Sequence, residues 1–548
     1  MTHFKAVIAA AMLALCTGSL IQGTAAAAER SAGADAMSGT RAVRPTRACA
    51  ALAGLRIAGT GLTLTQAAEV PAARPGTTVD ETGVGRIPVA VPAYCRARGI
   101  IDPHTGPDGK SYGLTVELAL PDAWNGRFLF QGGGGLNGVL RPPLGDNAAG
   151  DRPALARGFA VVSTDGGHRG AVFDSAFLAD QQAALDFAFK AVPTVAVAAK
   201  RTVAIYYGKP AAHSYFDGCS TGGREGMEAV ERYPMLFDGV ISGAPAMRTG
   251  YSNIALKWAA VAFNRIAPRD PSTGRPIPGG AFSPADRQLI VNGVLKACDA
   301  LDGVKDGMIF DARACRFDPI VLECKGSKVA GCLSRAQVDA LHTAFAGPVA
   351  ASGRRIYVGR PYDTGIAAHA PGPSPGGFLL TSTAGPVAGD SLPLTIDLEA
   401  EQASVEANAL QQLTDTDRWT NLGTFAAHGG KQIFYHGMSD PWFSPLDTID
   451  YYERLAHASG GLEKTRGFAR LFLVPGMGHC AGGPATLDHF DLLTPLVDWV
   501  ERGEAPRAVT ATGRDFPGRS RPLCAWPLHA QYRGHGDTNE AASFECRE

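Results

Sequence analysis

Short apolar runs alternate with segments of helical periodicity through the first and last parts of the chain. The apolar runs predict strands at 112–120, 127–130, 159–163, 214–216, 239–242, 432–435 and 471–474. Segments with helical spacing lie between or after these runs, at 181–203, 224–232, 448–458 and 490–502. Strands and helices that alternate in this way form mostly parallel sheets covered by helices, so we predict an α/β fold with a doubly wound sheet.

The middle of the chain has a different pattern. From about 250 to 425 it is rich in Pro, Gly and Cys, its periodicity is weak, and 268–284 and 371–386 have loop-like composition. We therefore expect a second domain, 251–425, inserted into a catalytic domain made of 29–250 and 426–548.

The first 28 residues have the features of a signal peptide. His3 and Lys5 precede an apolar run at 6–20, and small residues end at Ala28. The alternative is a membrane anchor, but this run is short, and no later stretch approaches the roughly 18 apolar residues of a spanning helix. We expect a secreted or periplasmic protein with no membrane contact after cleavage.

Composition narrows the possible functions. Of 548 residues, 45% are hydrophobic and 19% are charged, which disfavours intrinsic disorder. Lys and Arg number 51 against 52 Asp and Glu, without a basic run, which disfavours nucleic acid as a partner.

Cysteine usage indicates disulfides. Removal of Cys16 with the leader leaves ten of the 11 cysteines in an exported chain, and the absence of a CxxC pair disfavours zinc. Proximity in the sequence suggests three pairs: Cys298 with Cys315, Cys324 with Cys332, and Cys524 with Cys546. Four cysteines remain: Cys49, Cys95, Cys219 and Cys480.

A G-x-S-x-G motif at 218–222 lies between a predicted strand and a predicted helix. This is the setting of a nucleophile elbow, a sharp turn that exposes the hydroxyl of Ser220. Asp440 and His479 follow in that order, each just after a predicted strand. His479 would take the proton of Ser220, and Asp440 would orient the imidazole. The alternatives are a plain glycine turn, a turn aspartate and a surface histidine.

The glycine run 132–135 follows another predicted strand. Glycines there would let backbone N–H groups point at an oxyanion. We expect Gly133, and after it Gly134, to donate together with the Thr221 N–H; the alternative is a flexible loop.

Two cysteines flank the candidate catalytic residues. Cys219 precedes the serine and Cys480 follows the histidine, so a bridge between them would hold the two loops together. The alternative is that they belong to two unrelated disulfides.

Four aspartates lie close together among glycines: Asp299, Asp302, Asp306 and Asp311. The spacing is not that of an EF-hand, but closely spaced carboxylates suit Ca²⁺, which binds several oxygen ligands. The alternative is a solvated acidic turn.

These motifs together resemble one family. The segment GCSTGGR at 218–224, the pair His479-Cys480 and the aspartate cluster are similar to the tannase/feruloyl esterase family, over roughly residues 45–548. The resemblance implies an α/β-hydrolase core with a large inserted lid domain, a structural Ca²⁺ in the lid and no organic cofactor. It implies these Ca²⁺ ligands: the side chains of Asp299, Asp302 and Asp306 and the carbonyls of Val304 and Met308. It also implies that Cys49 pairs with Cys95.

The resemblance implies a carboxylic ester hydrolase acting on small aromatic esters. Members of the family hydrolyse feruloyl esters, galloyl esters or mono-(2-hydroxyethyl) terephthalate. Trp442 and Phe443 look similar to the residues that follow the aspartate in the terephthalate-ester members. Thr221, in contrast, looks like the residue that follows the serine in the broader family. We expect His436, Trp442 and Phe443 to bind the substrate. Three lid aromatics are further candidates for contact with the ring: Trp258, Phe378 and Trp419.

Two other functions are compatible with such a fold: a non-catalytic secreted binding module and a peptidase. The sequence leaves the acyl group, the alcohol and the oligomeric state open.

Overall fold

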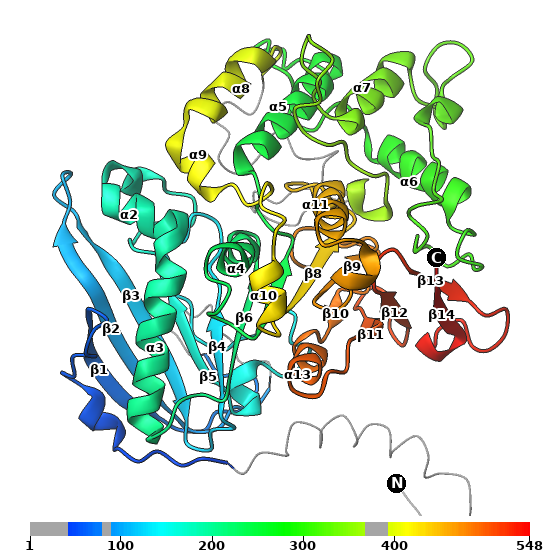
Figure 1. The fold of residues 1–548 in the computed structure, drawn as a ribbon. Coiled ribbons are helices and arrows are strands. Elements are labelled where there is room, and N and C mark those ends of the chain that lie inside the picture. The colour runs from blue at the N-terminus through cyan, green and yellow to red at the C-terminus, as the bar shows by residue number, and fades with distance from the viewer. Residues whose placement is uncertain (1–41, 79–88, 368–392) are drawn as a thin grey trace, which may run out of the picture. The chain divides into compact units, whose positions relative to one another are not determined.

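A sheet of nine strands is the largest among the described residues of the computed structural model, which are 42–78, 89–367 and 393–548 (Figure 1). The strand order is β1-β2-β3-β5-β4-β6-β7-β8-β9. Strands β4 to β9 pair in parallel, and β1, β2 and β3 extend the sheet by antiparallel pairing. The strands are β1 Leu62–Val70, β2 Tyr94–Thr105, β3 Ser111–Pro121, β4 Arg127–Gln131, β5 Ala160–Thr164, β6 His213–Cys219, β7 Gly239–Gly243, β8 Lys431–Gly437 and β9 Ala469–Val474.

Helices cover both faces of this sheet. Three of them share one apolar core with the strands: α3 (Ala191–Tyr207), α4 (Thr221–Arg232) and α11 (Pro445–Ala458). Phe216 of β6 points into this core. Its neighbour Tyr215 points to the opposite face, because side chains alternate along a strand, and its hydroxyl donates to Glu501 of α13 (Leu493–Arg502) at 2.7 Å. The parallel strands therefore end at one edge with helices on either side.

All seven predicted strands are present, as β3 to β9. The predicted helix 181–203 is divided into α2 (Gln181–Leu185), a π-helical turn (Asp186–Lys190) and α3. Strands β1 and β2 were not predicted. Polar residues such as Arg98 interrupt the apolar pattern of β2, and Arg98 pairs with Glu117 of β3 instead of facing the core.

The segment between β7 and β8 carries six α-helices among the described residues: α5 Thr249–Ile266, α6 Pro284–Cys298, α7 Arg335–Ala346, α8 Leu398–Ala407, α9 Ala409–Thr414 and α10 Gly423–Ala427. Helices α5 to α9 gather at the top of the view in Figure 1. They have apolar clusters of their own, one around Phe282, Ile290 and Leu341 and another around Tyr251 and Tyr357. The boundaries 251 and 425 stay a prediction, but an insertion with its own core lies where the pattern changed.

Two small sheets follow the large one. The first joins β10 (His489–Phe490), β11 (Ala508–Thr512) and β12 (Ser520–Cys524), and the second joins β13 (His529–Tyr532) and β14 (Phe544–Arg547). The Tyr532 N–H donates to the Asp302 carbonyl at 2.8 Å. The end of the chain therefore contacts the inserted segment.

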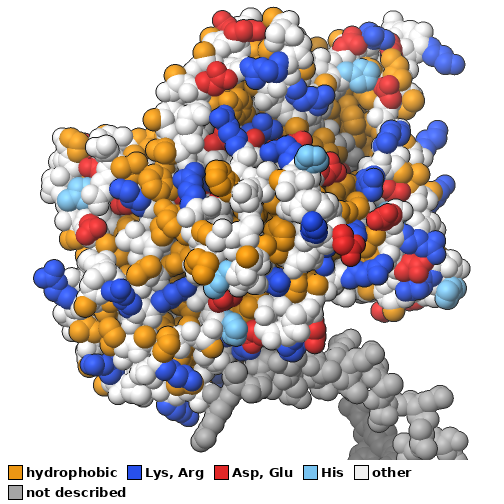
Figure 2. Space-filling view, in the orientation of Figure 1, with side chains coloured by type: hydrophobic (Ala, Val, Ile, Leu, Met, Phe, Trp, Pro, Cys, Tyr) orange, Lys and Arg blue, Asp and Glu red, His pale blue; other side chains and the backbone are white. Residues whose placement is uncertain are grey.

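The surface in Figure 2 carries Lys and Arg side chains interspersed with Asp and Glu. No helix among the described residues combines the length and the apolar character that crossing a membrane requires. The segment expected to be a signal peptide lies outside the described residues.

Candidate active site

Ser220 lies in a sharp turn between β6 and α4. Its φ of 65° is uncommon for a residue with a side chain. The neighbouring glycines allow the close approach of backbone segments that this turn needs. A Cβ on Gly218 would lie 2.6 Å from the backbone of Gly222, and one on Gly223 would lie 2.2 Å from the Gly243 carbonyl oxygen. The turn has the geometry expected of a nucleophile elbow.

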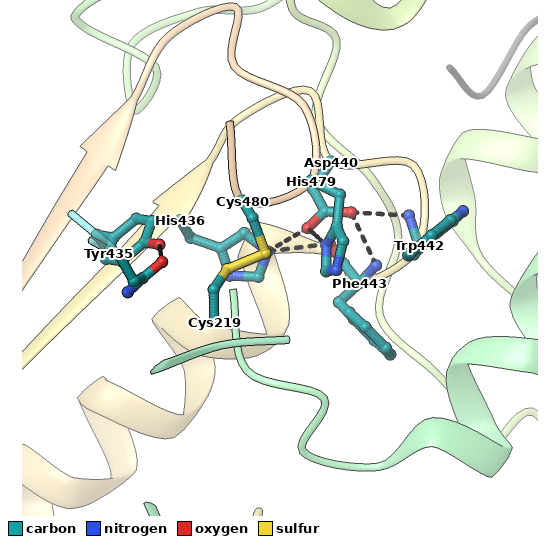
Figure 3. Close-up of a disulfide and its surroundings, with 9 residues drawn as sticks. Cys219, Tyr435, His436, Asp440, Trp442, Phe443, His479 and Cys480 are labelled. Carbon is teal, nitrogen blue, oxygen red and sulfur yellow. Dashed lines mark hydrogen bonds and ion pairs between the residues drawn. A yellow bond between two sulfur atoms is a disulfide. The ribbon is translucent and has the colours of Figure 1, made fainter. Parts of the chain in front are cut away.

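His479 and Asp440 meet beyond the carboxyl ends of β9 and β8 (Figure 3). His479 Nδ1 lies 2.7 Å from Asp440 Oδ2. Asp440 Oδ1 accepts the N–H groups of Trp442 and Phe443 at 2.8 and 3.1 Å. His479 Nε2 is buried and has no hydrogen-bond partner among the described residues. With Nδ1 held by the carboxylate, Nε2 is the nitrogen available to accept a proton.

Asp440 stays ionised although it is buried. Burial by itself would raise the pKa of the carboxyl, but the charge of His479 and hydrogen bonds from His436 and His479 hold this pKa below its ordinary value. A fixed negative charge is what stabilises an imidazolium beside it.

A disulfide joins the serine turn to the histidine loop. The α carbons of Cys219 and Cys480 are 5.9 Å apart, although 261 positions separate the two residues. Figure 3 shows Asp440 and His479 beside this bridge, with Trp442 and Phe443 further from Cys219. The other bridges are Cys49–Cys95, Cys298–Cys315, Cys324–Cys332 and Cys524–Cys546, so all five expected pairings occur.

A pocket opens beside Ser220, between the elbow and the inserted helices. Much of its lining is apolar or aromatic, including Leu136, Phe173, Leu256, Leu410, Trp442 and Phe443. The rings of Trp442 and Phe443 lie 4.6 and 5.4 Å from the His479 ring, centroid to centroid. These two predicted substrate-binding residues therefore lie between the pocket and the candidate base.

His436 has a different place from the one expected. Its side chain is 0% exposed. Nδ1 lies 2.9 Å from the Thr448 hydroxyl, and Nε2 lies 3.2 Å from Asp440 Oδ2 and 3.1 Å from the Phe443 carbonyl oxygen. With both nitrogens engaged behind Asp440, His436 does not reach the pocket. Substrate contact is therefore corrected to a role in holding the carboxylate.

The glycine loop after β4 also departs from the expectation. The Gly133 N–H donates to Glu225 Oε2 of α4 at 2.9 Å, and Asn137 Nδ2 donates to Glu225 Oε1 at 2.9 Å. The Thr221 hydroxyl donates to the Gly135 carbonyl, a second bond between the loop and α4. The Gly133 N–H is thus occupied, and the expected oxyanion contact is corrected.

Of the three expected backbone donors, two remain for an oxyanion. The N–H groups of Gly134 and Thr221 have no acceptor among the described residues. Thr221 is the first residue of α4, where helical N–H groups lack a partner within the helix. Glu225 could not be found from the sequence pattern, because a glutamate inside a helix normally indicates a solvated face.

The described lid aromatics do not line the pocket. Trp419 is 56% exposed, and the Trp258 indole N–H donates to the Thr343 carbonyl at 2.8 Å. Phe378 lies outside the described residues. Phe173 and Phe187, which precede the insertion, line the pocket instead.

The aspartate cluster forms a loop after α6. Asp299 Oδ1 accepts the N–H groups of Asp306 and Gly307 at 3.1 and 3.0 Å, and Asp306 forms an ion pair with Arg521. Asp302 is buried, and its Oδ2 has no hydrogen-bond partner among the described residues. Burial, with the charges of Asp306 and Asp299, raises the pKa of Asp302 to about 7. An unpartnered buried carboxylate fits a nearby cation.

The full ligand set is not assembled in this arrangement. The N–H groups of Val304 and Met308 donate to Asp302 Oδ1 and Asp306 Oδ1, each at 3.2 Å. Within the described part of the chain, no three His, Cys, Asp or Glu side chains are grouped to hold a metal ion. Binding of Ca²⁺ therefore stays a prediction.

The parallel sheet, the serine elbow and the Asp–His pair beyond successive strands define an α/β-hydrolase fold. A family model described as "Tannase and feruloyl esterase" matches residues 95–385 and 386–547. The chain belongs to this family.

Similar proteins agree with this assignment. Mono(2-hydroxyethyl) terephthalate hydrolase of Piscinibacter sakaiensis is 39% identical over 83% of this chain and 85% of that protein. A probable feruloyl esterase of Arthroderma benhamiae is 30% identical over 81% of this chain and 84% of that protein. The crystal structure of feruloyl esterase B from Aspergillus oryzae has a TM-score of 0.71 and 26% identity, covering 89% of this chain and 97% of that one. The chain is a carboxylic ester hydrolase.

Proposed function

We propose that this chain is a secreted serine esterase that cleaves esters of aromatic carboxylic acids through Ser220, His479 and Asp440. The observation that carries the proposal is the 2.7 Å contact between His479 Nδ1 and Asp440 Oδ2. The loop that holds His479 is joined to the serine elbow by the Cys219–Cys480 disulfide. The chemistry of such a triad accounts for each group.

In this mechanism, Ser220 Oγ attacks the ester carbonyl carbon and passes its proton to His479 Nε2. The oxyanion forms at the start of α4, where the Thr221 N–H and the helix dipole favour negative charge, and the Gly134 N–H is the second donor. The imidazolium protonates the leaving alcohol, and an acyl-serine ester remains. Water then attacks this ester with His479 as base, which releases the acid.

The pocket supports an aromatic acyl group. The rings of Phe173 and Trp442 lie 6.2 Å apart at 85°, which leaves ring faces and edges along the wall beside Ser220. An aromatic contact of this kind is worth about 0.5–1.5 kcal/mol beyond burial. The similar proteins are named for hydrolysis of feruloyl and terephthalate esters.

Charge in the pocket favours feruloyl- or galloyl-type esters. Mono-(2-hydroxyethyl) terephthalate has a free carboxylate, whose recognition calls for an unpaired cation. Arg224 is the one charged side chain among the described lining residues. Its guanidinium donates to the Ala188 and Phe187 carbonyls at 2.9 and 3.1 Å and pairs with Glu228 at 3.2 Å. The terephthalate monoester is the second candidate, because the relative at 39% identity is named for it.

Secretion and Ca²⁺ belong to the same proposal. Five disulfides require an oxidising compartment to form and persist. A structural Ca²⁺ would be held by five residues: Asp299, Asp302 and Asp306 through side chains, and Val304 and Met308 through carbonyls. The ion would neutralise the Asp302 carboxylate and stabilise the loop after α6, without a part in ester cleavage.

A three-ester panel tests the proposal. Wild-type protein and Ser220→Ala are assayed on methyl ferulate, methyl gallate and mono-(2-hydroxyethyl) terephthalate. We expect kcat/KM of the wild type to be highest on one of the two neutral esters and Ser220→Ala to lose at least roughly 10⁴-fold. Highest activity on the terephthalate monoester would favour the second candidate. Unchanged activity of Ser220→Ala would refute the mechanism.

A further inference from the structure

One carboxylate of the inserted segment contacts both loops of the candidate catalytic site. We call 438–444 the acid loop and 475–480 the base loop. Asp363 Oδ2 accepts the Ser439 hydroxyl at 2.7 Å and the Gly476 N–H at 2.7 Å. Ser439 directly precedes Asp440, and Gly476 lies three positions before His479. A single oxygen atom therefore joins the two loops.

This junction is buried and closely packed. Asp363 is 2% exposed, and Ser439 is 3% exposed. The Ser439 hydroxyl also accepts the Gly365 N–H at 2.9 Å, so it donates to one residue of the inserted segment and accepts from another. A Cβ on Gly365 would lie 2.5 Å from the Gly476 carbonyl oxygen, so the backbones are nearly in contact. Loss of the Asp363 carboxylate would leave a buried hydroxyl and a buried N–H with fewer partners, which is costly.

Arg360 holds the acid loop from the same side. It is 8% exposed, and its guanidinium forms no ion pair with a carboxylate of the described residues. Nη1 donates to the Asp440 carbonyl at 2.9 Å, and Nη2 donates to the Trp442 carbonyl at 3.2 Å. These carbonyls belong to the turn whose N–H groups hold Asp440 Oδ1. Arg360 therefore fixes the backbone that aims the carboxylate at His479.

We propose that Asp363 is a positioning residue that sets the spacing between the acid loop and the base loop, with Arg360 securing the acid loop. The inserted segment then controls the geometry of the Asp440–His479 pair in addition to walling the pocket. This inference rests on the proposed Ser-His-Asp mechanism. It does not depend on which acyl group the pocket prefers.

The leaving alcohol provides a readout that a merely structural role would not move. His479 must protonate ethanol as it leaves ethyl acetate, whereas 4-nitrophenolate leaves 4-nitrophenyl acetate without protonation. A misplaced imidazole should therefore penalise the ethyl ester more. We expect Asp363→Ala to lower kcat/KM on ethyl acetate by roughly 10- to 100-fold, the scale of a displacement of about 1 Å, with a smaller loss on 4-nitrophenyl acetate. The ratio kcat/KM is compared because it reports acylation, whereas both acetates share the later hydrolysis of one acetyl-serine.

Two variants calibrate this result. Asp363→Asn keeps an oxygen that can accept both bonds, so it should recover most of the wild-type kcat/KM on ethyl acetate. Asp286→Ala is the matched control, because Asp286 is a buried acceptor of the inserted segment, bonded to Ser283 and Gln337, that contacts neither loop. It should lower the melting temperature and leave the ratio of the two kcat/KM values unchanged.

Equal losses of kcat/KM on the two acetates, or wild-type kcat/KM for Asp363→Ala, would overturn the inference. If Asp363→Ala does not fold, Ser439→Ala decides: it removes the other half of the junction and should show the same dependence on the leaving group. Failure on the aromatic panel with normal acetate hydrolysis would refute the proposed substrate class and leave this inference intact.

Discussion

The Gly133 N–H donates to the Glu225 carboxylate across 2.9 Å. Glu225 lies on the helix that begins immediately after Ser220. The bond therefore links the glycine loop, which carries one candidate oxyanion donor, to the element that carries the other.

Replacement of Glu225 should separate loop geometry from substrate binding. Glu225→Ala frees the loop, so we expect kcat to fall by up to roughly 100-fold while KM changes little, because the oxyanion donors act in the transition state. Glu225→Gln should stay near the wild type. Its amide oxygen can accept the Gly133 N–H. If the Asn137 amide turns over, the glutamine NH₂ can donate to Asn137 Oδ1, which in the wild type has no partner among the described residues. Steady-state kinetics of both variants measure these changes in kcat and KM. A fully active Glu225→Ala would show that the glycine loop keeps its geometry without the bond to Glu225.

The Cys219–Cys480 bridge should matter more for rate than a bridge elsewhere does. In the chain-entropy model, closing so long a loop stabilises the fold by about 5–6 kcal/mol before strain. It also fixes the serine turn to the histidine loop. A displacement of about 1 Å between the two can lower the rate roughly 100-fold. A Cys219→Ser/Cys480→Ser double variant should therefore lose kcat while still folded by circular dichroism. Cys324→Ser/Cys332→Ser should lose stability only. Equal kcat in the two double variants would show that the Cys219–Cys480 bridge contributes to stability and not to catalytic geometry.

Chelation of Ca²⁺ should lower the melting temperature of the protein markedly and its kcat only slightly. A Ca²⁺ bound only by the native loop after α6 raises the melting temperature by mass action. Asp302→Asn removes the unpartnered carboxylate and should abolish the response to Ca²⁺. Melting curves with Ca²⁺ and with excess chelator are compared for both proteins. Superimposable curves for the wild type would mean that this loop binds no Ca²⁺.

Phe443 should affect aromatic substrates selectively. Its ring lines the pocket and lies 5.4 Å from the His479 ring. Phe443→Ala should raise KM for methyl ferulate several-fold, since a lost aromatic contact of about 0.5–1.5 kcal/mol corresponds to roughly 2- to 13-fold. Methyl butyrate is the aliphatic comparison and should be affected less. The same increase on both esters would assign Phe443 to packing alone.

His168 should make stability depend on pH below neutrality. Its ring stacks on Phe177 at 3.7 Å, both ring nitrogens lack partners among the described residues, and burial lowers its pKa to about 4. The unfolded chain, with a His pKa of about 6.5, binds more protons in the window between these values. The free energy of unfolding should therefore fall as pH drops from about 6.5 towards 4. Urea unfolding at several pH values gives the free energy of unfolding of both proteins, and His168→Phe should lose less of it between about pH 6.5 and 4. If this free energy falls equally with pH in the two proteins, His168 is not the group responsible.

The residues that the sequence identified are those with a local signal. Ser220 lies in a spaced motif, and Asp440 and His479 follow apolar strands at positions where parallel sheets place their sites. Asp363 and Glu225 have no such signal. Their partners are backbone N–H groups 113 and 92 positions away, so along the chain they look like ordinary charged residues.

The direction in which a side chain or an N–H group points is the second feature that the sequence pattern could not predict. His436 is the penultimate residue of β8 and Asp440 follows shortly after the strand ends, yet His436 points behind the carboxylate and not into the pocket. Within four consecutive glycines, the pattern likewise could not tell which N–H faces an acceptor. Strands β1 and β2 were missed because long-range antiparallel pairing stabilises them in spite of their polar residues.

The bridge between Cys219 and Cys480 also makes the inserted segment part of a covalent ring. A protease that cuts one exposed peptide bond between Ser220 and Asp440 leaves two fragments, one carrying Ser220 and the other carrying Asp440 and His479. The fragments stay joined at the point where the catalytic groups meet. A nicked molecule therefore migrates as one band without reductant and as two with it, and its catalytic groups remain on a single covalent assembly until the disulfide is reduced.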